Sequence, residues 1–202
     1  MLYSTESRVF MLDFLKEALH APLRVGAVAP SSPRLAEMMA RRAVADRPRQ
    51  ILEVGAGDGA ITKALLAARS KETHLLICER SETFRPALEQ LLADETNVTL
   101  FIGDIQKLST SWSRQIDVIV SGLPFASFPA TLRHDLLAQF QTLLRSGGHF
   151  IAFQYTRFQF KMFRDYFQEH SYSHTLYNLP PAYVFEGVQQ EEIDHAYTFD
   201  RR

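Results

Sequence analysis

The sequence has little that would support a disulfide framework or a membrane span. Cys78 is the only cysteine among 202 residues, so no intramolecular disulfide can form, and its apolar surroundings, HLLICE, favour a buried thiol. No apolar run approaches the ~18 residues that a membrane-spanning helix needs. Residues 1–10 lack the basic segment and apolar core of a signal peptide, so we expect a cytoplasmic protein.

The sequence also has almost no net charge and no repeated segment. The formal net charge is −1, and no internal repeat or low-complexity segment is present. The charge is unevenly spread, because residues 1–50 carry eight Lys or Arg against five Asp or Glu. A basic N-terminal part could contact an anionic membrane or a nucleic acid, or could be an ordinary solvated surface. Charge alone does not choose between these interpretations.

From residue 50 onward, apolar runs alternate with helical patterns. The expected strands are 50–54, 74–79, 98–102, 116–121, 149–155, 172–179 and 182–188. The expected helices between them are 60–69, 82–94, 130–144 and 157–169. The first five runs are continuously apolar, which is typical of a parallel sheet covered by helices on both faces. The sequence therefore predicts an α/β fold, and the last two runs predict an antiparallel hairpin.

Two helices are expected before the first strand. Residues 5–20 place apolar side chains on one face of a helix, and this face could lie on a membrane surface or pack on the sheet. A second helix begins near Ser31 or Ser32, followed by Pro33 in its first turn. We therefore divide the chain into an N-terminal helical extension, 1–49, and a main domain, 50–202.

The stretch QILEVGAGDGAITKALL, residues 50–66, reads as a strand, a glycine turn and a helix. Its glycines fit both the G-x-G-x-G of methyl-donor enzymes and the G-x-G-x-x-A form of the dinucleotide fingerprint. In either case a ligand can approach the backbone and the start of the helix.

Three acids at the ends of three successive strands distinguish the two ligands. Glu53 lies inside the first apolar strand, where a dinucleotide site normally has an apolar residue. Glu79 ends the second strand, where a carboxylate can accept hydrogen bonds from ribose hydroxyls. Asp104 follows the third strand and can accept from an adenine amine, with Ile105 beside the ring. The pattern favours an adenosine that carries an amino acid.

With these features the chain resembles the class I S-adenosylmethionine-dependent methyltransferases. EVGAGDG resembles their first motif, and LLRSGGHF resembles the glycine turn before their fifth strand. The resemblance implies a Rossmann-like seven-stranded sheet and S-adenosylmethionine as cofactor, with S-adenosylhomocysteine as product and no metal. The residues it places at the cofactor are Val28, Ser31, Ser32, Glu53, Gly55, Gly57, Glu79, Arg80, Asp104, Ile105, Ser121 and Gly122.

The loop SGLPFASFP, residues 121–129, lies where the methyl group would be transferred. Methyltransferases that act on adenine amines, including the more distantly similar rRNA adenine dimethyltransferases, carry Asn-Leu-Pro-Tyr or Asn/Asp-Pro-Pro-Tyr here. This chain has Gly122 in place of the amide-bearing residue. Together with GAVAPSS (26–32) and NLPPAYV (178–184), the loop instead resembles the bacterial phospholipid N-methyltransferases, which methylate phosphatidylethanolamine.

That resemblance implies a phospholipid substrate, contact of the N-terminal helix with an anionic membrane, and no nucleic acid partner. The protein would then be peripheral on the inner face of the cytoplasmic membrane. The expected substrate-binding residues are Tyr3, Leu123, Pro124, Phe125, Tyr155 and Arg157. Tyr155 is also the candidate catalytic residue, since it ends the fifth strand, although the sequence offers no decisive general base. Aromatic faces such as Phe125, Phe128 and Tyr155 could hold a methylated ammonium.

Three alternatives remain open at this point. The enzyme could methylate RNA adenine or a soluble small molecule, which would require no lipid surface. The fold could bind S-adenosylmethionine without transferring its methyl group. An NAD-dependent oxidoreductase is the last alternative, because the glycine loop alone permits it.

Overall fold

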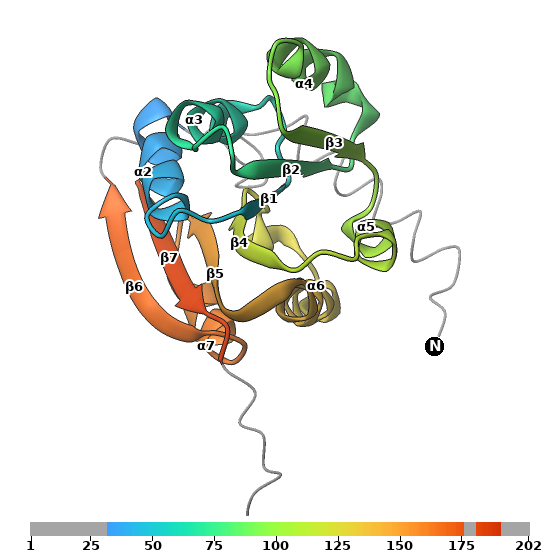
Figure 1. Ribbon diagram of the computed structural model, residues 1–202. Helices are drawn as coiled ribbons and strands as arrows, with labels where there is room; N and C mark the ends of the chain where they lie inside the picture. The colour runs from blue at the N-terminus through green and yellow to red at the C-terminus, as the bar shows by residue number, and fades with distance from the viewer. Residues whose placement is uncertain (1–31, 176–180, 191–202) are drawn as a thin grey trace, which may run out of the picture.

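The computed structural model describes residues 32–175 and 181–190, which form one seven-stranded sheet with strand order β3-β2-β1-β4-β5-β7-β6 (Figure 1). The strands are β1 (Gln50–Val54), β2 (His74–Glu79), β3 (Val98–Ile102), β4 (Ile116–Ser121), β5 (Leu144–Gln154), β6 (Gln168–Thr175) and β7 (Ala182–Val188). β1 to β5 are parallel, and β7 runs antiparallel to both β5 and β6. The predicted Rossmann-like sheet and its terminal antiparallel hairpin are confirmed.

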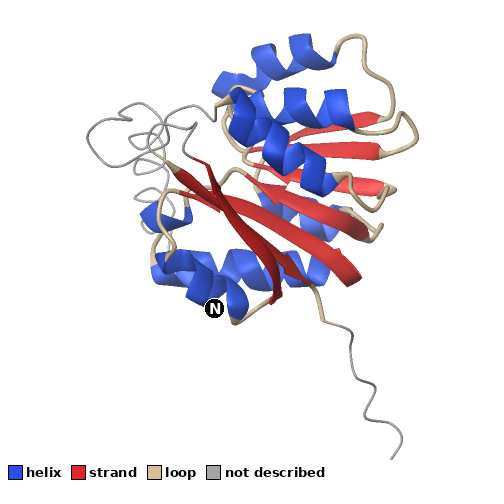
Figure 2. Cartoon of the chain, turned by 90° about the vertical axis from the view of Figure 1, so that its left-hand side faces the viewer, coloured by secondary structure: helices blue, strands red, loops and turns tan. Residues whose placement is uncertain are grey.

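Helices cover both faces of the sheet (Figure 2). They are α2 (Pro33–Ala43), α3 (Ala60–Ala68), α4 (Arg85–Leu92), α5 (Ile105–Ser111), α6 (Ala130–Leu143) and α7 (Phe158–Arg164), with short 3₁₀ helices η1 (Glu82–Phe84) and η2 (Phe125–Ser127). The hydrophobic core on one face draws its helical residues from α5, α6 and α7. The core on the other face draws them from α2, α3 and α4. β1, β2, β4 and the carboxyl half of β5 are thus largely buried between two helical layers, as their apolar runs predicted, whereas the edge strand β3 is only partly buried.

Helix α2 begins with the serine and proline that the sequence marked. Ser32 is its N-cap and accepts a hydrogen bond from the Leu35 amide at 3.3 Å, and Pro33 occupies the first turn. Leu35 and Met39 are fully buried against the sheet. The described part of the predicted N-terminal extension therefore belongs to a helical layer of the fold, while residues 1–31, including the expected helix 5–20, lie outside the described residues. The domain boundary at residue 49 stays a prediction.

A polar network ties α2 to the terminal hairpin. Arg42 of α2 donates to Glu186 of β7 at 3.1 Å and to Ser171 of β6 at 2.7 Å. The imidazole of His149 on β5 lies 2.9 Å from the same carboxylate, and this hydrogen bond raises the pKa of His149. Burial alone would raise the pKa of Glu186, but the hydrogen bonds from His149 and Ser171 and the charge of Arg42 hold it below its usual range. Four elements are joined by these contacts.

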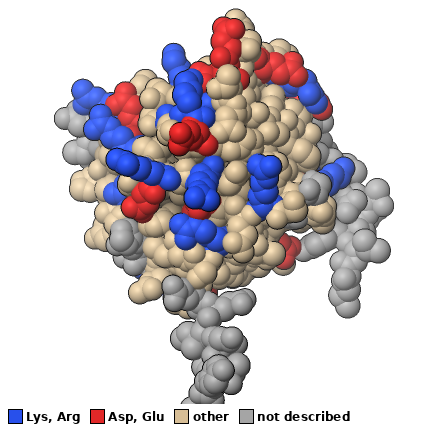
Figure 3. Space-filling model, viewed as in Figure 1, with Lys and Arg blue, Asp and Glu red and all other residues tan. Residues whose placement is uncertain are grey.

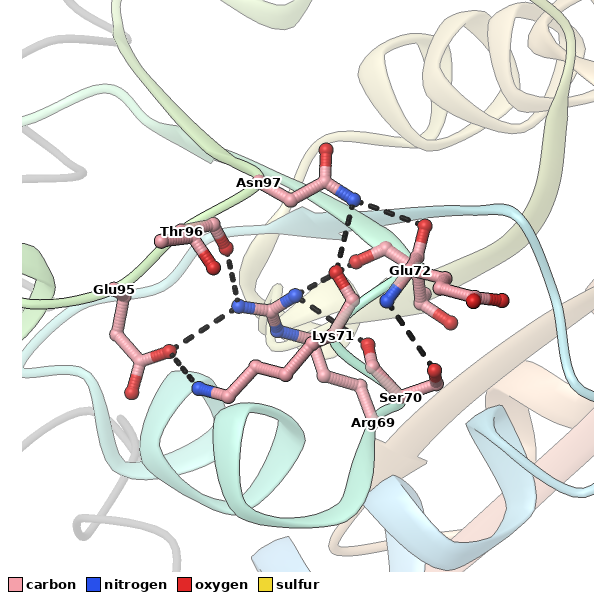
Figure 4. A network of polar contacts seen from close by, with 8 residues as sticks. Arg69, Ser70, Lys71, Glu72, Glu95, Thr96 and Asn97 are labelled. Atoms are coloured by element: carbon pink, nitrogen blue, oxygen red, sulfur yellow. Dashed lines mark hydrogen bonds and ion pairs between the residues drawn. The ribbon is translucent and has the colours of Figure 1, made fainter.

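A buried arginine closes the amino edge of the sheet (Figure 4). The side chain of Arg69, at the end of α3, has an exposed fraction of 0% and donates to the carbonyls of Thr73 and Thr96, both at 2.7 Å. It also contacts Glu95 at 3.2 Å, and Lys71 reaches the same carboxylate from the surface at 2.8 Å. The arginine therefore fastens the turn before β2 to the turn before β3.

Several elements differ from the sequence prediction. β6 begins at Gln168, before the expected strand 172–179, because Gln168 already pairs with Val188 of β7. β5 begins at Leu144 and includes the glycine pair that was expected to end the preceding helix, because Leu144 pairs with Ile116 and a register shift accommodates the extra residues. α7 ends at Arg164, although buried Phe163 and Phe167 continue the helical spacing. α5 was not predicted, since its sequence, IQKLSTS, has little apolar periodicity.

The surface viewed in Figure 3 mixes both signs of charge. Basic and acidic side chains are intermixed over this face. Within the described ranges, none of the helices combines the length and the apolar character needed to cross a membrane.

Candidate active site

The glycine turn after β1 packs against Leu123 at Gly55 and has open space beside Gly57. Gly55, Gly57 and Gly59 have φ values of +78°, +56° and +84°, which residues with a side chain rarely adopt. A Cβ on Gly55 would lie 2.7 Å from the Leu123 side chain, whereas a Cβ on Gly57 would meet nothing within 4 Å. A ligand can thus approach the backbone at Gly57, and the start of α3 lies immediately behind it.

Glu79, at the end of β2, holds this turn in place. One carboxylate oxygen accepts from the Gly57 amide at 2.8 Å and the other accepts from the Ser81 amide at 2.7 Å. Each oxygen retains capacity for a further hydrogen bond, such as one from a ribose hydroxyl. At the end of β3, Asp104 caps α5 by accepting from the Gln106 amide at 3.0 Å. Both acids therefore also shape the backbone, which the sequence did not reveal.

The segment after β4 packs directly on the glycine turn. The Gly122 amide donates to the carbonyl of Val54 at 2.9 Å, and a Cβ on Gly122 would lie 2.6 Å from the Gly55 carbonyl oxygen. Only glycine allows this backbone contact. The buried hydroxyl of Ser121 accepts from the Leu123 amide at 3.3 Å, which fixes the start of the loop. The two segments expected to bind cofactor and acceptor are therefore one packed unit.

Gln154, the last residue of β5, joins this unit and was missed in the sequence. Its Nε2 donates to the Leu123 carbonyl at 3.0 Å, and its exposed fraction is only 4%. The contact joins residues 31 positions apart. The sequence could have marked this glutamine, because it ends the apolar strand segment FIAFQ, where a buried amide needs polar partners.

Comparison with known proteins identifies the family. A profile of methyltransferase domains matches residues 51–148. The ornithine lipid N-methyltransferase of Singulisphaera acidiphila is 31% identical over 177 residues, which cover 82% of this chain and 90% of that protein. The chain belongs to the class I S-adenosylmethionine-dependent methyltransferases. At the level of the reaction it is an N-methyltransferase, with S-adenosylmethionine as its cofactor.

Solved structures share the fold of this methyltransferase. The N-methyltransferase NodS from Bradyrhizobium japonicum, bound to S-adenosylhomocysteine, aligns with a TM-score of 0.70 at 13% identity over 89% of this chain and 98% of NodS. The O-methyltransferase TomG from Streptomyces achromogenes, bound to S-adenosylmethionine, gives 0.64 at 15% identity over 93% of this chain and 100% of TomG. Across the described residues no group of three or more His, Cys, Asp or Glu could hold a metal ion.

The buried carboxylate of Glu53 fits a positively charged cofactor. Glu53 is fully buried, and neither of its oxygens makes a hydrogen bond of regular geometry. Burial is the main cause that raises its pKa to about 8, and the negative charge of Glu79 adds to the shift, while the hydroxyl and amide of nearby Thr62 oppose it. An unpaired buried carboxyl is costly, and a sulfonium and an ammonium close by would offset that cost.

Most of the predicted cofactor residues meet at the carboxyl edge of the sheet. The strand ends or the loops that follow them carry Glu53, Gly55, Gly57, Glu79, Arg80, Asp104, Ile105, Ser121 and Gly122. Arg80 is exposed, and Ile105, the first residue of α5, is buried. Ser32 caps α2, whereas Val28, Ser31 and Tyr3 lie outside the described residues. Direct contact of each residue with the cofactor stays a proposal.

The structure buries Phe125, which was expected to bind the substrate, in the hydrophobic core. Its exposed fraction is 0%, and its ring packs edge-on against Phe163 and Phe150 at centroid distances of 5.1 and 6.4 Å. Phe128, at 6% exposed, joins the same core. Stacking on a substrate would require Phe125 to leave this aromatic cluster. The apolar ring of Phe125 contributes to the core, where its packing anchors η2 and the preceding loop.

The other expected acceptor residues lie at the same edge. Tyr155 is half-buried and packs edge-on against Phe153 at 5.8 Å. The guanidinium carbon of Arg157 is 5.6 Å from the centre of the Tyr183 ring, a cation–π distance. Pro124 begins η2 and is partly buried. The substrate roles of these residues, and the catalytic role of Tyr155, stay predictions.

Proton release on cofactor binding should report on Glu53. Below about pH 8 the free protein holds a proton on Glu53, and a cationic cofactor favours the ionised form. Affinity for S-adenosylmethionine should therefore rise with pH, by up to about tenfold per unit, and level off near pH 8. In Glu53→Gln this dependence should disappear. Calorimetry in buffers of different ionisation enthalpy measures the protons released, and an unchanged pH profile in the variant would contradict the placement of Glu53.

Proposed function

We propose that this methyltransferase methylates the headgroup amine of phosphatidylethanolamine and of its methylated derivatives. The observation that carries the proposal is the 31% identity with a lipid N-methyltransferase across 82% of the chain. The loop SGLPFASFP and the segments GAVAPSS and NLPPAYV, which resemble phospholipid N-methyltransferases, support a phospholipid as the acceptor.

The loop 121–129 and the carboxyl end of β5, together called the acceptor edge, can receive a neutral amine. Bound S-adenosylmethionine would supply an electrophilic methyl carbon. As the lone pair of the amine bonds to this carbon, the carbon–sulfur bond breaks and its electron pair stays on sulfur. The loop 121–129 contains no charged residue. An ammonium that enters this surrounding is destabilised relative to the neutral amine, and its proton can leave to solvent. Position and desolvation then promote the transfer.

The start of α7 supports contact with a lipid surface. Phe158 has an exposed fraction of 87%, whereas Phe160 and Phe163 of the same helix are buried and hold it against the core. Arg157 and Lys161 flank the exposed ring and are themselves exposed. This helix follows directly from the strand end that carries Gln154. Docking through Phe158, with basic side chains on lipid phosphates, would turn the acceptor edge toward the membrane.

Ornithine lipid is a second candidate acceptor. The relative in Singulisphaera acidiphila is an ornithine lipid N-methyltransferase by name. The ornithine headgroup also ends in an amine, so the same uncharged loop can receive it. The two lipids differ next to the amine, where phosphatidylethanolamine has a phosphate and ornithine lipid has none. Exposed Arg157 and Lys161 are suited to bind that phosphate, and the carboxylate of the ornithine headgroup is the corresponding anion in the second candidate.

Methyl transfer to lipid vesicles tests the proposal. The protein is incubated with labelled S-adenosylmethionine and vesicles that contain phosphatidylethanolamine, ornithine lipid or only phosphatidylglycerol, and the lipids are analysed by mass spectrometry. We expect label in phosphatidylethanolamine and none in phosphatidylglycerol, which has no amine. Label in ornithine lipid alone would move the assignment to the second candidate. Intact cofactor binding without label in any lipid would contradict a lipid acceptor.

A surface variant separates membrane docking from chemistry. Phe158→Ser should reduce vesicle flotation and vesicle-dependent transfer by at least about tenfold, because one buried aromatic ring contributes on the order of 1.5–3 kcal/mol. Tyr172→Ser is the matched control, since Tyr172 on β6 is the other exposed large hydrophobic residue of the described chain, at 50%. Equal flotation of both variants would remove α7 from the docking surface.

A further inference from the structure

The loop 121–129 has no amide side chain at the position where methyltransferases of planar amines carry one. Gly122 occupies the place of the amide-bearing residue in methyltransferases of planar amines, and glycine is required there because a Cβ would lie 2.6 Å from the Gly55 carbonyl oxygen. A side chain that binds the acceptor nitrogen must therefore come from another strand. Gln154 of β5 reaches the same loop, where its Nε2 lies 3.0 Å from the Leu123 carbonyl oxygen.

The two ends of the Gln154 amide have different surroundings. Its Nε2 donates to two backbone carbonyls, those of Leu123 and Phe153. Since both partners are acceptors, the nitrogen must face them and the oxygen must face away. Oε1 has no donor among the described residues, yet it is not one of the polar atoms that are sealed from solvent. A side chain with only 4% exposure thus keeps an unpaired acceptor atom within reach of solvent.

We propose that Gln154 binds the acceptor amine, with Oε1 accepting a hydrogen bond from an N–H of the nitrogen that is methylated. The assignment rests on the proposed function, because it needs an amine acceptor at this edge. The fixed Nε2 contacts orient Oε1 before the substrate arrives, so little entropy is lost on binding. The nitrogen becomes more positive as it attacks, and the hydrogen bond strengthens in the transition state.

The number of N–H groups on the acceptor gives the proposal a specific signature. A neutral unmethylated amine has two N–H groups, a monomethylated amine has one and a dimethylated amine has none. The contribution of Oε1 therefore applies to the first two methylations and vanishes for the third. A role limited to holding the loop through Nε2 would affect all three equally.

Two substitutions separate the oxygen from the nitrogen of the amide. Gln154→Met keeps the length of the side chain and removes both polar atoms, while Gln154→Glu keeps an acceptor and removes the donor to Leu123. With phosphatidylethanolamine in vesicles, we expect Gln154→Met to lower kcat/KM about tenfold, the size of one hydrogen bond. Gln154→Glu should retain several-fold more activity than Gln154→Met. With the dimethylated lipid as acceptor, the two variants should lose this difference.

The control is Gln141→Met, which also removes a glutamine donor to a backbone carbonyl, that of Tyr166 at 2.6 Å, but lies on α6, whose core residues cover the opposite face of the sheet from the cluster that Tyr155 joins. It should leave kcat/KM within about twofold of wild type, and S-adenosylhomocysteine affinity should be unchanged in all variants. Equal losses of Gln154→Met with the unmethylated and the dimethylated lipid would overturn the assignment of Oε1, while wild-type transfer keeps the proposed function. Absence of transfer by the wild type to any amine lipid would overturn both.

Discussion

Alanine at position 122 is expected to lower cofactor affinity about a hundredfold, or ~2.8 kcal/mol. A Cβ there would lie 2.6 Å from the Gly55 carbonyl oxygen, and no side-chain rotation can relieve a contact between two backbone segments. The loop after β4 would move away from the glycine turn, and the hydrogen bond from the Gly122 amide to Val54 would lengthen. Calorimetry with S-adenosylhomocysteine measures the loss, and circular dichroism checks that the variant is folded.

Gly148→Ala is the matched control for Gly122→Ala. A Cβ on Gly148 would lie 2.9 Å from the Arg145 carbonyl oxygen and 3.0 Å from that of Asp117, so the backbone crowding is similar. Gly148 is near the amino end of β5, at the opposite edge of the sheet from the glycine turn. This variant should lower thermal stability and leave cofactor affinity of the folded protein unchanged. A similar fall in affinity would mean that general destabilisation, not the Gly55 contact, weakens cofactor binding.

Removal of the buried guanidinium should give the largest loss of stability. Arg69→Met keeps most of the packing but leaves the carbonyls of Thr73 and Thr96 without their donor inside the protein. Unpaired buried polar groups of this kind cost about 3 kcal/mol in free energy of unfolding, which corresponds to a fall of roughly 6–12 °C in Tm for a chain of this size. Scanning calorimetry or urea unfolding measures the difference.

Lys71 provides the comparison, since it shares the Glu95 carboxylate with Arg69. The Lys71 side chain is 67% exposed, whereas that of Arg69 is 0% exposed. Exposed ion pairs contribute little because solvent screens them, so Lys71→Ala should melt close to the wild-type temperature. If both variants lost the same stability, the ion pair with Glu95 rather than the two buried carbonyl contacts would hold this edge together.

The fold and the cofactor-binding edge of the sheet were predictable because their backbone conformations permit only certain residues at key positions. Positive φ values at Gly55, Gly57 and Gly59 require glycine, so the turn leaves a visible motif. Parallel strands end at one edge, so acids that end successive runs are expected to meet there, as Glu79 and Asp104 do. These features depend on local spacing and on one topological rule.

The acceptor side was less predictable because it depends on contacts between distant segments. Phe125 was expected to face the substrate, but the pattern of one short loop does not show which ring enters the core, and the structure packs it against Phe150 and Phe163. The contact of Gln154 with Leu123 spans 31 residues and crosses from one strand to the loop of its neighbour. Nothing in either local sequence specifies that partner.

The network between α2 and the terminal hairpin has a consequence for synthesis on the ribosome. Arg42 is made early, yet its partner Glu186 follows 144 residues later. β5 has no second neighbour in the sheet until β7 is made, and β6 joins the sheet only through β7. Contacts between residues so far apart in the chain slow folding and leave strand edges exposed during synthesis. A nascent chain that ends before residue 182 therefore has an incomplete sheet, which can close only after β7 has been synthesised.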